Sequence, residues 1–155
     1  MATPGKSHYN AGKLRVEEIS GSNKTIAANE TGELYLIIDG TGVTVTLPQP
    51  TQGAYAKFLV GTSFQAQGAG EGFSIHTPGT SVLLKGSLTC TDKATANKIN
   101  TGVSDAANDY RLIINGTNAK DIMAGSSIEC IADGTSWHVN GLVICEDNNI
   151  SGSFS

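Results

Sequence analysis

Apolar and polar residues alternate in short runs along most of this chain. The clearest run covers residues 43–47, in which Val43, Val45 and Leu47 are separated by threonines. Because successive side chains of a strand point to opposite faces, this spacing places the three apolar side chains on one face. Similar runs predict about nine or ten short strands. They cover residues 13–20, 33–39, 43–47, 57–60, 73–76, 82–84, 87–91, 110–114, 127–132 and 137–144.

Glycine and proline separate these runs. A tight-turn sequence, Asp39–Gly42, follows the run at 33–39, Pro48 ends the next one, and Asp133–Gly134 joins the last two into a hairpin. Gly86 marks a bulge or a bend between sheets. Short strands at this spacing predict an all-β fold, an antiparallel β-sandwich or barrel. Amphipathic helical segments are lacking, which excludes a parallel βαβ architecture, and the irregular spacing predicts no internal repeat.

The chain divides into three segments by its density of strand-forming residues. Residues 1–12 are polar and predict a flexible N-terminal arm, and residues 146–155 predict a flexible C-terminal tail. Residues 13–145 predict one domain, whose length is sufficient for a single core without a metal or disulfide.

Two stretches of this domain are less regular. Residues 92–108 are the least strand-like and predict a long loop or a single helical turn. In the first expected strand, Leu14, Val16 and Ile19 are the residues expected to face inward.

Composition narrows the class of partner. Charged residues make up only 15% of the chain, the formal net charge is −4, and no run of lysine or arginine occurs. Nucleic-acid binding needs clustered cations, so we expect none. We expect no membrane partner, because no stretch approaches the length of a spanning helix, and no signal peptide, because the first residues lack an apolar segment. A surface with few charges favours contact with other proteins.

The residues that most often carry chemistry are scattered. The nearest histidine and cysteine, His138 and Cys145, lack the spacing of a zinc site, and the three cysteines contain no CxxC pair and predict buried thiols. Glu17 and Glu18 are adjacent on an expected strand and point to opposite faces, so they cannot act together as acid and base. The sequence therefore predicts no catalytic, cofactor-binding or metal site, and a protein that is not an enzyme.

Trp137, the single tryptophan, has two interpretations. In the core it would fill the sandwich behind the turn at Asp133, which is the favoured interpretation. On the surface it would anchor an interface or stack on a sugar. Tyr9, in the arm, is the stronger candidate for an interface aromatic.

Two parts of the sequence carry a resemblance to a known family. The first comprises residues 26–32, 34–37, Val43-Thr-Val-Thr-Leu-Pro48, Gly53 and 57–60; the second comprises 125–130, Asp133-Gly-Thr-Ser-Trp-His-Val139 and Gly141. Together they resemble β-rich virion proteins of tailed bacteriophages, in particular head decoration (cement) proteins.

The resemblance implies a structural protein with a jelly-roll-like β fold. Such a protein would be made in the host cytoplasm, lie on the outer capsid surface of the virion, stabilise the shell, and have the major capsid protein and itself, as a homotrimer, for partners. We expect the N-terminal arm to become ordered along the shell. The residues expected to form this capsid-binding arm are Thr3, Pro4, Lys6, His8 and Tyr9.

Two other classes of protein stay open at this stage. One is a tail-fibre or tailspike module that binds a host receptor or glycan, for which the aromatic content of 6% supplies little stacking surface. The other is a small β-barrel enzyme of the cupin type, which needs several histidine and carboxylate ligands on adjacent strands.

Overall fold

The computed structural model describes residues 15–65, 72–92, 99–105, 107–115, 122–145 and 151–155. Within them the chain forms strands and one short 3-10 helix, η1 (Ala28–Glu30), and contains no α-helix. The strands are β1 (Val16–Ser20), β2 (Lys24–Thr25), β3 (Glu33–Asp39), β4 (Thr44–Thr46), β5 (Tyr55–Val60), β6 (Phe73–His76), β7 (Leu84–Asp92), β8 (Ile99–Val103), β9 (Arg111–Asn115), β10 (Ser127–Ala132), β11 (Trp137–Cys145) and β12 (Ser151–Phe154). The all-β fold predicted from the sequence is confirmed.

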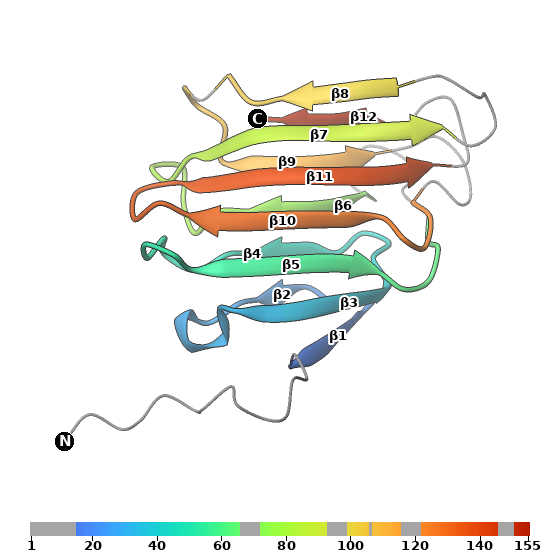
Figure 1. Cartoon of the computed structure of the whole chain (residues 1–155), viewed down its shortest axis with the longest axis horizontal. Coiled ribbons are helices and arrows are strands. Elements are labelled where there is room, and N and C mark those ends of the chain that lie inside the picture. Colours follow the sequence, from blue (N-terminus) through green and yellow to red (C-terminus); the bar gives the residue numbers. More distant parts are fainter. Residues whose placement is uncertain (1–14, 66–71, 93–98, 106, 116–121, 146–150) are drawn as a thin grey trace.

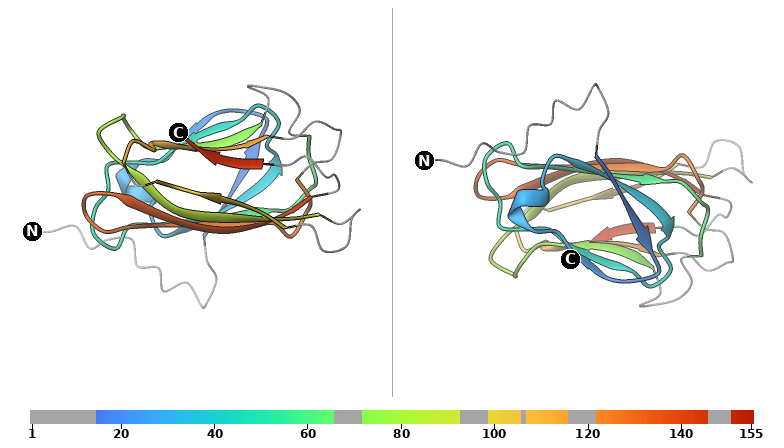
Figure 2. Two further views of the ribbon diagram at one scale, coloured as in Figure 1. Left: turned by 90° about the horizontal axis from the view of Figure 1, so that it is seen from above. Right: turned by 90° about the horizontal axis from the view of Figure 1, so that it is seen from below.

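The strands form two sheets that lie face to face. The larger sheet has seven strands in the order β1-β3-β5-β10-β11-β7-β8, and the smaller has five in the order β12-β9-β6-β4-β2. The larger sheet faces the viewer in Figure 1, and the two layers are seen edge-on in Figure 2. The result is a two-layer β-sandwich.

The pairing is mixed, which differs from the antiparallel pairing expected from the sequence. Strand β3 runs parallel to both β1 and β5, β4 runs parallel to both β2 and β6, and β7 runs parallel to β11. The remaining neighbours, such as β10 with β5 and β11, are antiparallel.

The parallel pairs arise from the way the first half of the chain is wound. From β1 to β6 the chain passes to the opposite sheet at every step, so each sheet receives every second strand. Strands that follow one another within a sheet are therefore parallel, and the crossovers are strands of the other sheet rather than helices. This winding is a short coil. The sequence predicted no repeat, because the loops between successive strands differ in length and hide the regular winding.

Many strand boundaries agree with the hydrophobic pattern. Strands β3, β6 and β10 have the predicted bounds, and Val43, Val45 and Leu47 are all buried. Ile19 faces the core as expected, whereas Val16 is half exposed. Val16 pairs with Leu34 on the outer face of the sheet, so its predicted inward orientation is wrong.

Three strands lie where none was expected: the two-residue β2, which pairs with β4, and two longer strands. Strand β8 occupies part of the stretch 92–108 and pairs with β7, and β12 occupies the end of the predicted C-terminal tail and pairs with β9. Both strands are rich in serine, threonine, asparagine or glycine, which hides them from a search for apolar alternation. The flexible tail predicted for residues 146–155 is thus wrong for 151–155, and residues 146–150 lie outside the described residues.

The core fills the space between the sheets. Tyr35 stacks on Phe58 within the larger sheet, at 5.4 Å between ring centroids, and Phe58 meets the edge of Phe73 from the smaller sheet at 6.2 Å. Trp137 is fully buried and its indole Nε1 donates a hydrogen bond to the Pro48 carbonyl oxygen at 3.0 Å. The core interpretation of Trp137 is confirmed. The predicted burial of Cys90, Cys130 and Cys145 is also confirmed, and burial raises the pKa of the Cys130 thiol.

Candidate interaction surface

The exposed apolar side chains gather on one face of the molecule. Among the described residues, five large apolar side chains are 43–68% exposed. The pairing register puts all five on the outer face of the seven-stranded sheet, because each alternates along its strand with residues that point into the core. They are Val16, Ile99, Val103, Ile131 and Leu142. Partly buried Leu34, Leu36, Ile38 and Leu59 lie on the same face.

The outer face of the five-stranded sheet has a different chemistry. Its outward residues include Thr25, Thr44, Thr46, Ser74 and His76, which alternate with the buried Val45 and Ile75. The hydroxyl groups of Thr44 and Ser74 are hydrogen-bonded at 3.0 Å. One face of the sandwich is therefore rich in hydroxyl groups and the other in exposed aliphatic groups.

An ion pair lies near the middle of the apolar face. The ammonium group of Lys57, on β5, donates to Glu129 Oε1, on the neighbouring β10, at 2.6 Å, and the Tyr55 hydroxyl lies 3.5 Å from the same oxygen. The hydrogen bond to Glu129 raises the pKa of Lys57. Beside this pair the face has a shallow depression of about 320 Å³. It is lined by Thr89, Ser127, Glu129, Asn140, Gly141 and Leu142.

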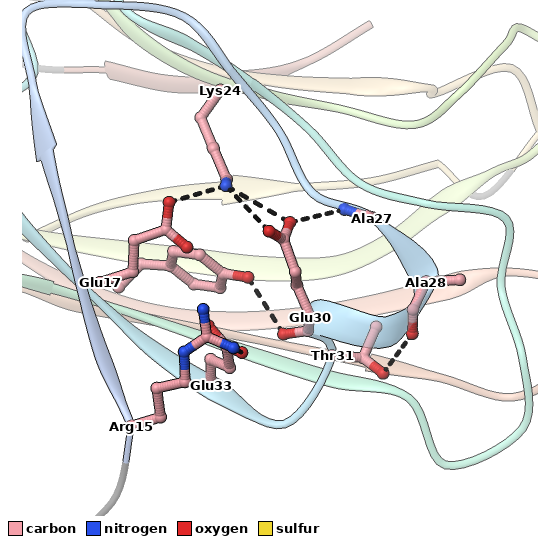
Figure 3. A network of polar contacts seen from close by, with 9 residues as sticks. Arg15, Glu17, Lys24, Ala27, Ala28, Glu30, Thr31 and Glu33 are labelled. Carbon is pink, nitrogen blue, oxygen red and sulfur yellow. Dashed lines mark hydrogen bonds and ion pairs between the residues drawn. The ribbon is translucent and has the colours of Figure 1, made fainter. Parts of the chain in front are cut away.

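A network of charged groups occupies the edge of the sandwich at β1 and β2 (Figure 3). Lys24 lies between two carboxylates, 2.7 Å from Glu17 Oε1 and 3.3 Å from Glu30 Oε2. Burial alone would lower the pKa of Lys24, but its hydrogen bonds to these carboxylates outweigh burial and raise it. Glu30 also accepts the Ala27 N–H at 2.8 Å, which is the main reason why its pKa is lowered. The network thus joins β1, β2 and η1.

The same edge holds a buried carboxylate. Glu33 is 2% exposed and pairs with the guanidinium of Arg15 at 2.8 Å, while the Arg15 side chain is 57% exposed. Glu33 Oε2 and Glu17 Oε2 are buried without a hydrogen-bond partner among the described residues. A buried charge depends on its partner, so Arg15 is the residue that makes the burial of Glu33 tolerable. Arg15 is also the first described residue after the N-terminal arm.

The structure places the predicted site residues as follows. Thr3, Pro4, Lys6, His8 and Tyr9 all lie outside the described residues, so the arm hypothesis stays a prediction. The apolar outer face was missed at the sequence level. A signal for it is present in the uninterrupted apolar run from Leu34 to Ile38, because a strand with a polar outer face would alternate.

The described residues were compared with the patterns of a metal site and a membrane span, and the chain with known proteins. Within the described ranges, no three histidine, cysteine or acidic side chains come together in a way that could hold a metal ion. The same part of the chain contains no helix of the length and apolarity that a membrane span requires. No protein-family model, curated protein or solved structure matches this chain.

Proposed function

We propose that this chain is a structural protein of a phage particle, a capsid decoration subunit that binds the outer surface of the head and stabilises the shell. The arm would contact the major capsid protein, and the β-sandwich would be the rigid body that the arm attaches. The jelly-roll likeness stays a prediction within this proposal, because the mixed sheets support a two-layer sandwich and nothing finer.

The observation that carries the proposal is the anchoring of the arm's root. Arg15 pairs with the buried Glu33, and β1, which begins at the next residue, is tied to β2 and η1 through Lys24. Glu33 is buried whereas Arg15 is exposed, and loss of Arg15 would leave a buried carboxylate without its ion-pair partner, so the pair favours a fixed root. An arm that binds a shell transmits load to the body only if its root is fixed, and this edge provides that fixed point.

The multiplicity of sites on a shell makes modest contacts sufficient. Several copies that are joined to one another and bound to neighbouring shell subunits convert each further contact into an intramolecular one, which strengthens attachment without new chemistry. A short arm that becomes ordered on binding loses conformational entropy, which weakens each contact. The large number of contacts per particle offsets this loss.

The first test is the copy number of this chain in purified particles of the parent virus, measured by quantitative mass spectrometry against the major shell protein. We expect a number comparable to that of the shell protein. A handful of copies per particle would contradict the decoration role and move the chain to the tail.

The second test isolates the arm. Deleting residues 2–12 should abolish binding to shells that lack this protein while leaving the thermal unfolding midpoint unchanged. The matched control is a variant in which residues 2–12 keep their composition in scrambled order. Unchanged binding by the deletion variant would reject the arm as the anchor, and full binding by the scrambled variant would show that its sequence is irrelevant.

One observation favours the alternative of a glycan-binding module. A depression of about 260 Å³ lies beside η1 and is lined by hydroxyl, amide and small side chains, which can hydrogen-bond a sugar. The lining residues are Ala28, Thr31, Gln49, Thr51, Gln52, Gly53 and Ala54. Binding to a glycan array that Gln52→Ala abolishes, together with a low copy number, would favour this alternative.

A further inference from the structure

We infer that the outer face of the seven-stranded sheet binds a second copy of this chain, face to face, about a two-fold axis that runs parallel to the strands between β5 and β10. This contact goes beyond the proposed attachment to a shell and differs from the threefold assembly that the sequence resemblance implies. Four properties of the face support it: its apolar character, its charge pattern, its shape and its size.

The apolar character requires a cover. The outer face of the smaller sheet is rich in hydroxyl groups, whereas that of the larger sheet carries all five of the most exposed aliphatic side chains among the described residues. Three of the five, Val16, Ile131 and Leu142, lie on strands within the proposed contact, whereas the two on β8 lie beyond it. Val16, Leu34, Leu36 and Leu59 are neighbours on β1, β3 and β5 and form a contiguous apolar surface. Such a surface marks a site of association. Because two sheets pack through such faces at about 10 Å, a second sheet is a natural cover.

The charge pattern is self-complementary. Lys57 and Glu129 are cross-strand neighbours on β5 and β10, so the proposed axis passes between them. Rotation about it brings Lys57 of each copy opposite Glu129 of the other. A two-fold contact uses the same patch on both copies, and it therefore needs each charge to meet its opposite in this way.

The apolar side chains are matched by the same rotation. Strand β3 of one copy then faces β11 of the other, and the register places Leu36 opposite Leu142 of the second copy. Tyr55 comes to lie opposite Ile131 for the same reason.

The shape of the face is complementary under this rotation as well. Leu59 and Ser127 are paired across β5 and β10, so Leu59 of one copy comes to lie over Ser127 of the other. Ser127 lines the shallow depression beside the ion pair, which has room for a leucine side chain. A leucine side chain therefore meets the hollow twice, once on each side of the axis.

The size of the face fits a dimer at the low end of the range of interfaces. With strands about 4.8 Å apart, the six strands that overlap span about 24 Å, and the outward residues of β11 from His138 to Ile144 extend about 20 Å along the strand. The flat area is roughly 480 Å², which is smaller than the roughly 800 Å² that each partner buries in a standard interface. Six strands overlap in the proposed arrangement, and β8 extends beyond it.

The experiment uses charge reversal in two variants, Lys57→Glu and Glu129→Lys, studied by sedimentation velocity over a range of concentrations. The wild-type chain should be a dimer. Each variant alone should be a monomer, with its dimer dissociation constant raised about 100-fold or more, because like charges then meet twice across the axis. An equimolar mixture of the two variants should form a heterodimer, because each acidic face then meets a basic one.

The mixture separates the contact between copies from the ion pair within each chain. Both variants lose the internal pair, so recovery of the dimer on mixing can come only from contact between copies. The internal pair is exposed and contributes little to folding, so both variants should keep the circular dichroism spectrum of the wild type.

A second pair of variants tests the apolar contacts. Leu142→Lys should weaken the dimer, whereas Thr25→Lys, on the outer face of the smaller sheet, should not. A wild-type chain that is monomeric at every concentration, or trimeric, would overturn the inference, as would a mixture of the charge variants that stays monomeric. A monomeric chain that still binds shells would overturn this contact alone and leave the proposed function intact.

Discussion

Gly86 illustrates how the pairing of two strands can depend on a single residue. It lies within β7 at φ +136°, a conformation that side-chain-bearing residues rarely adopt. A Cβ at this position would lie 1.9 Å from the carbonyl oxygen of Val139 on the parallel neighbour β11. The sequence predicted a bulge or bend at Gly86, and the structure shows a continuous strand that depends on the missing side chain.

Replacing Gly86 with alanine should destabilise the fold by about 2–5 kcal/mol, since strain in the backbone adds to a steric clash with a neighbouring strand. Chemical denaturation measures the free energy of unfolding. Gly79→Ala is the matched control, because a Cβ at Gly79 would have no heavy atom within 4 Å and this residue lies outside the positive-φ region. Equal stabilities for the two variants would show that β7 adjusts freely.

At the scale of elements, the β10–β11 hairpin is closed by one carboxylate. Asp133 Oδ1 accepts the N–H groups of Thr135 and Ser136 at 2.8 and 2.7 Å, and Oδ2 lies 2.7 Å from His138 Nε2. The hydrogen bond with His138, followed by those from the turn, holds the pKa of Asp133 well below its usual value. The ionised carboxylate thus favours the folded state.

This carboxylate makes stability depend on pH in the acid range. Its pKa is lower in the folded than in the unfolded chain, so its contribution is complete above the ordinary value of 3.8 and is lost as the pH falls from there toward the folded value. Thermal melts from pH 6 to pH 2 should show a shallower acid decline for Asp133→Asn than for the wild type. Asp39→Asn, in the other Asp–Gly turn, controls for the change in net charge, and an identical decline in Asp133→Asn and wild type would contradict the assignment.

The elements also show what the sequence could predict. Alternation reports which side chains are buried, so strands such as β4 and β10 and the burial of Trp137 were predictable. Alternation does not report which strands are neighbours in a sheet. The parallel pairing of β7 with β11, for example, joins segments that lie far apart in the chain. Strand β8 was missed because asparagine, threonine and glycine occupy its centre. The charged edge at Glu33 depends on a partner, Arg15, that only the fold brings near.

At the scale of the whole molecule, the two sheets pack through one shared core, and several specific contacts cross it. Trp137 belongs to the larger sheet, and the carbonyl that its indole reaches belongs to Pro48, just after β4 of the smaller sheet. The aromatic contact between Phe58 and Phe73 crosses the same space.

Trp137→Phe should lower the free energy of unfolding by about 2–3 kcal/mol, because the Pro48 carbonyl loses its buried donor and the smaller ring leaves a gap. Urea denaturation followed by circular dichroism measures this loss, since the variant lacks the tryptophan signal. Phe58→Leu, which reduces aromatic packing without removing a hydrogen bond, separates the two causes. If Trp137→Phe lowers the free energy of unfolding by less than Phe58→Leu does, the indole hydrogen bond contributes nothing to stability.

The coiled path of the first half has a consequence for how such a molecule could change in evolution. Each turn of the coil adds one strand to each sheet at its edge, as β1 and β2 do at the outermost position. Duplication or loss of one turn would widen or narrow both layers together without rethreading the rest of the chain. The breadth of the sandwich is therefore a quantity that natural variation can adjust in single steps, while the hairpin and the distant parallel pair stay as they are.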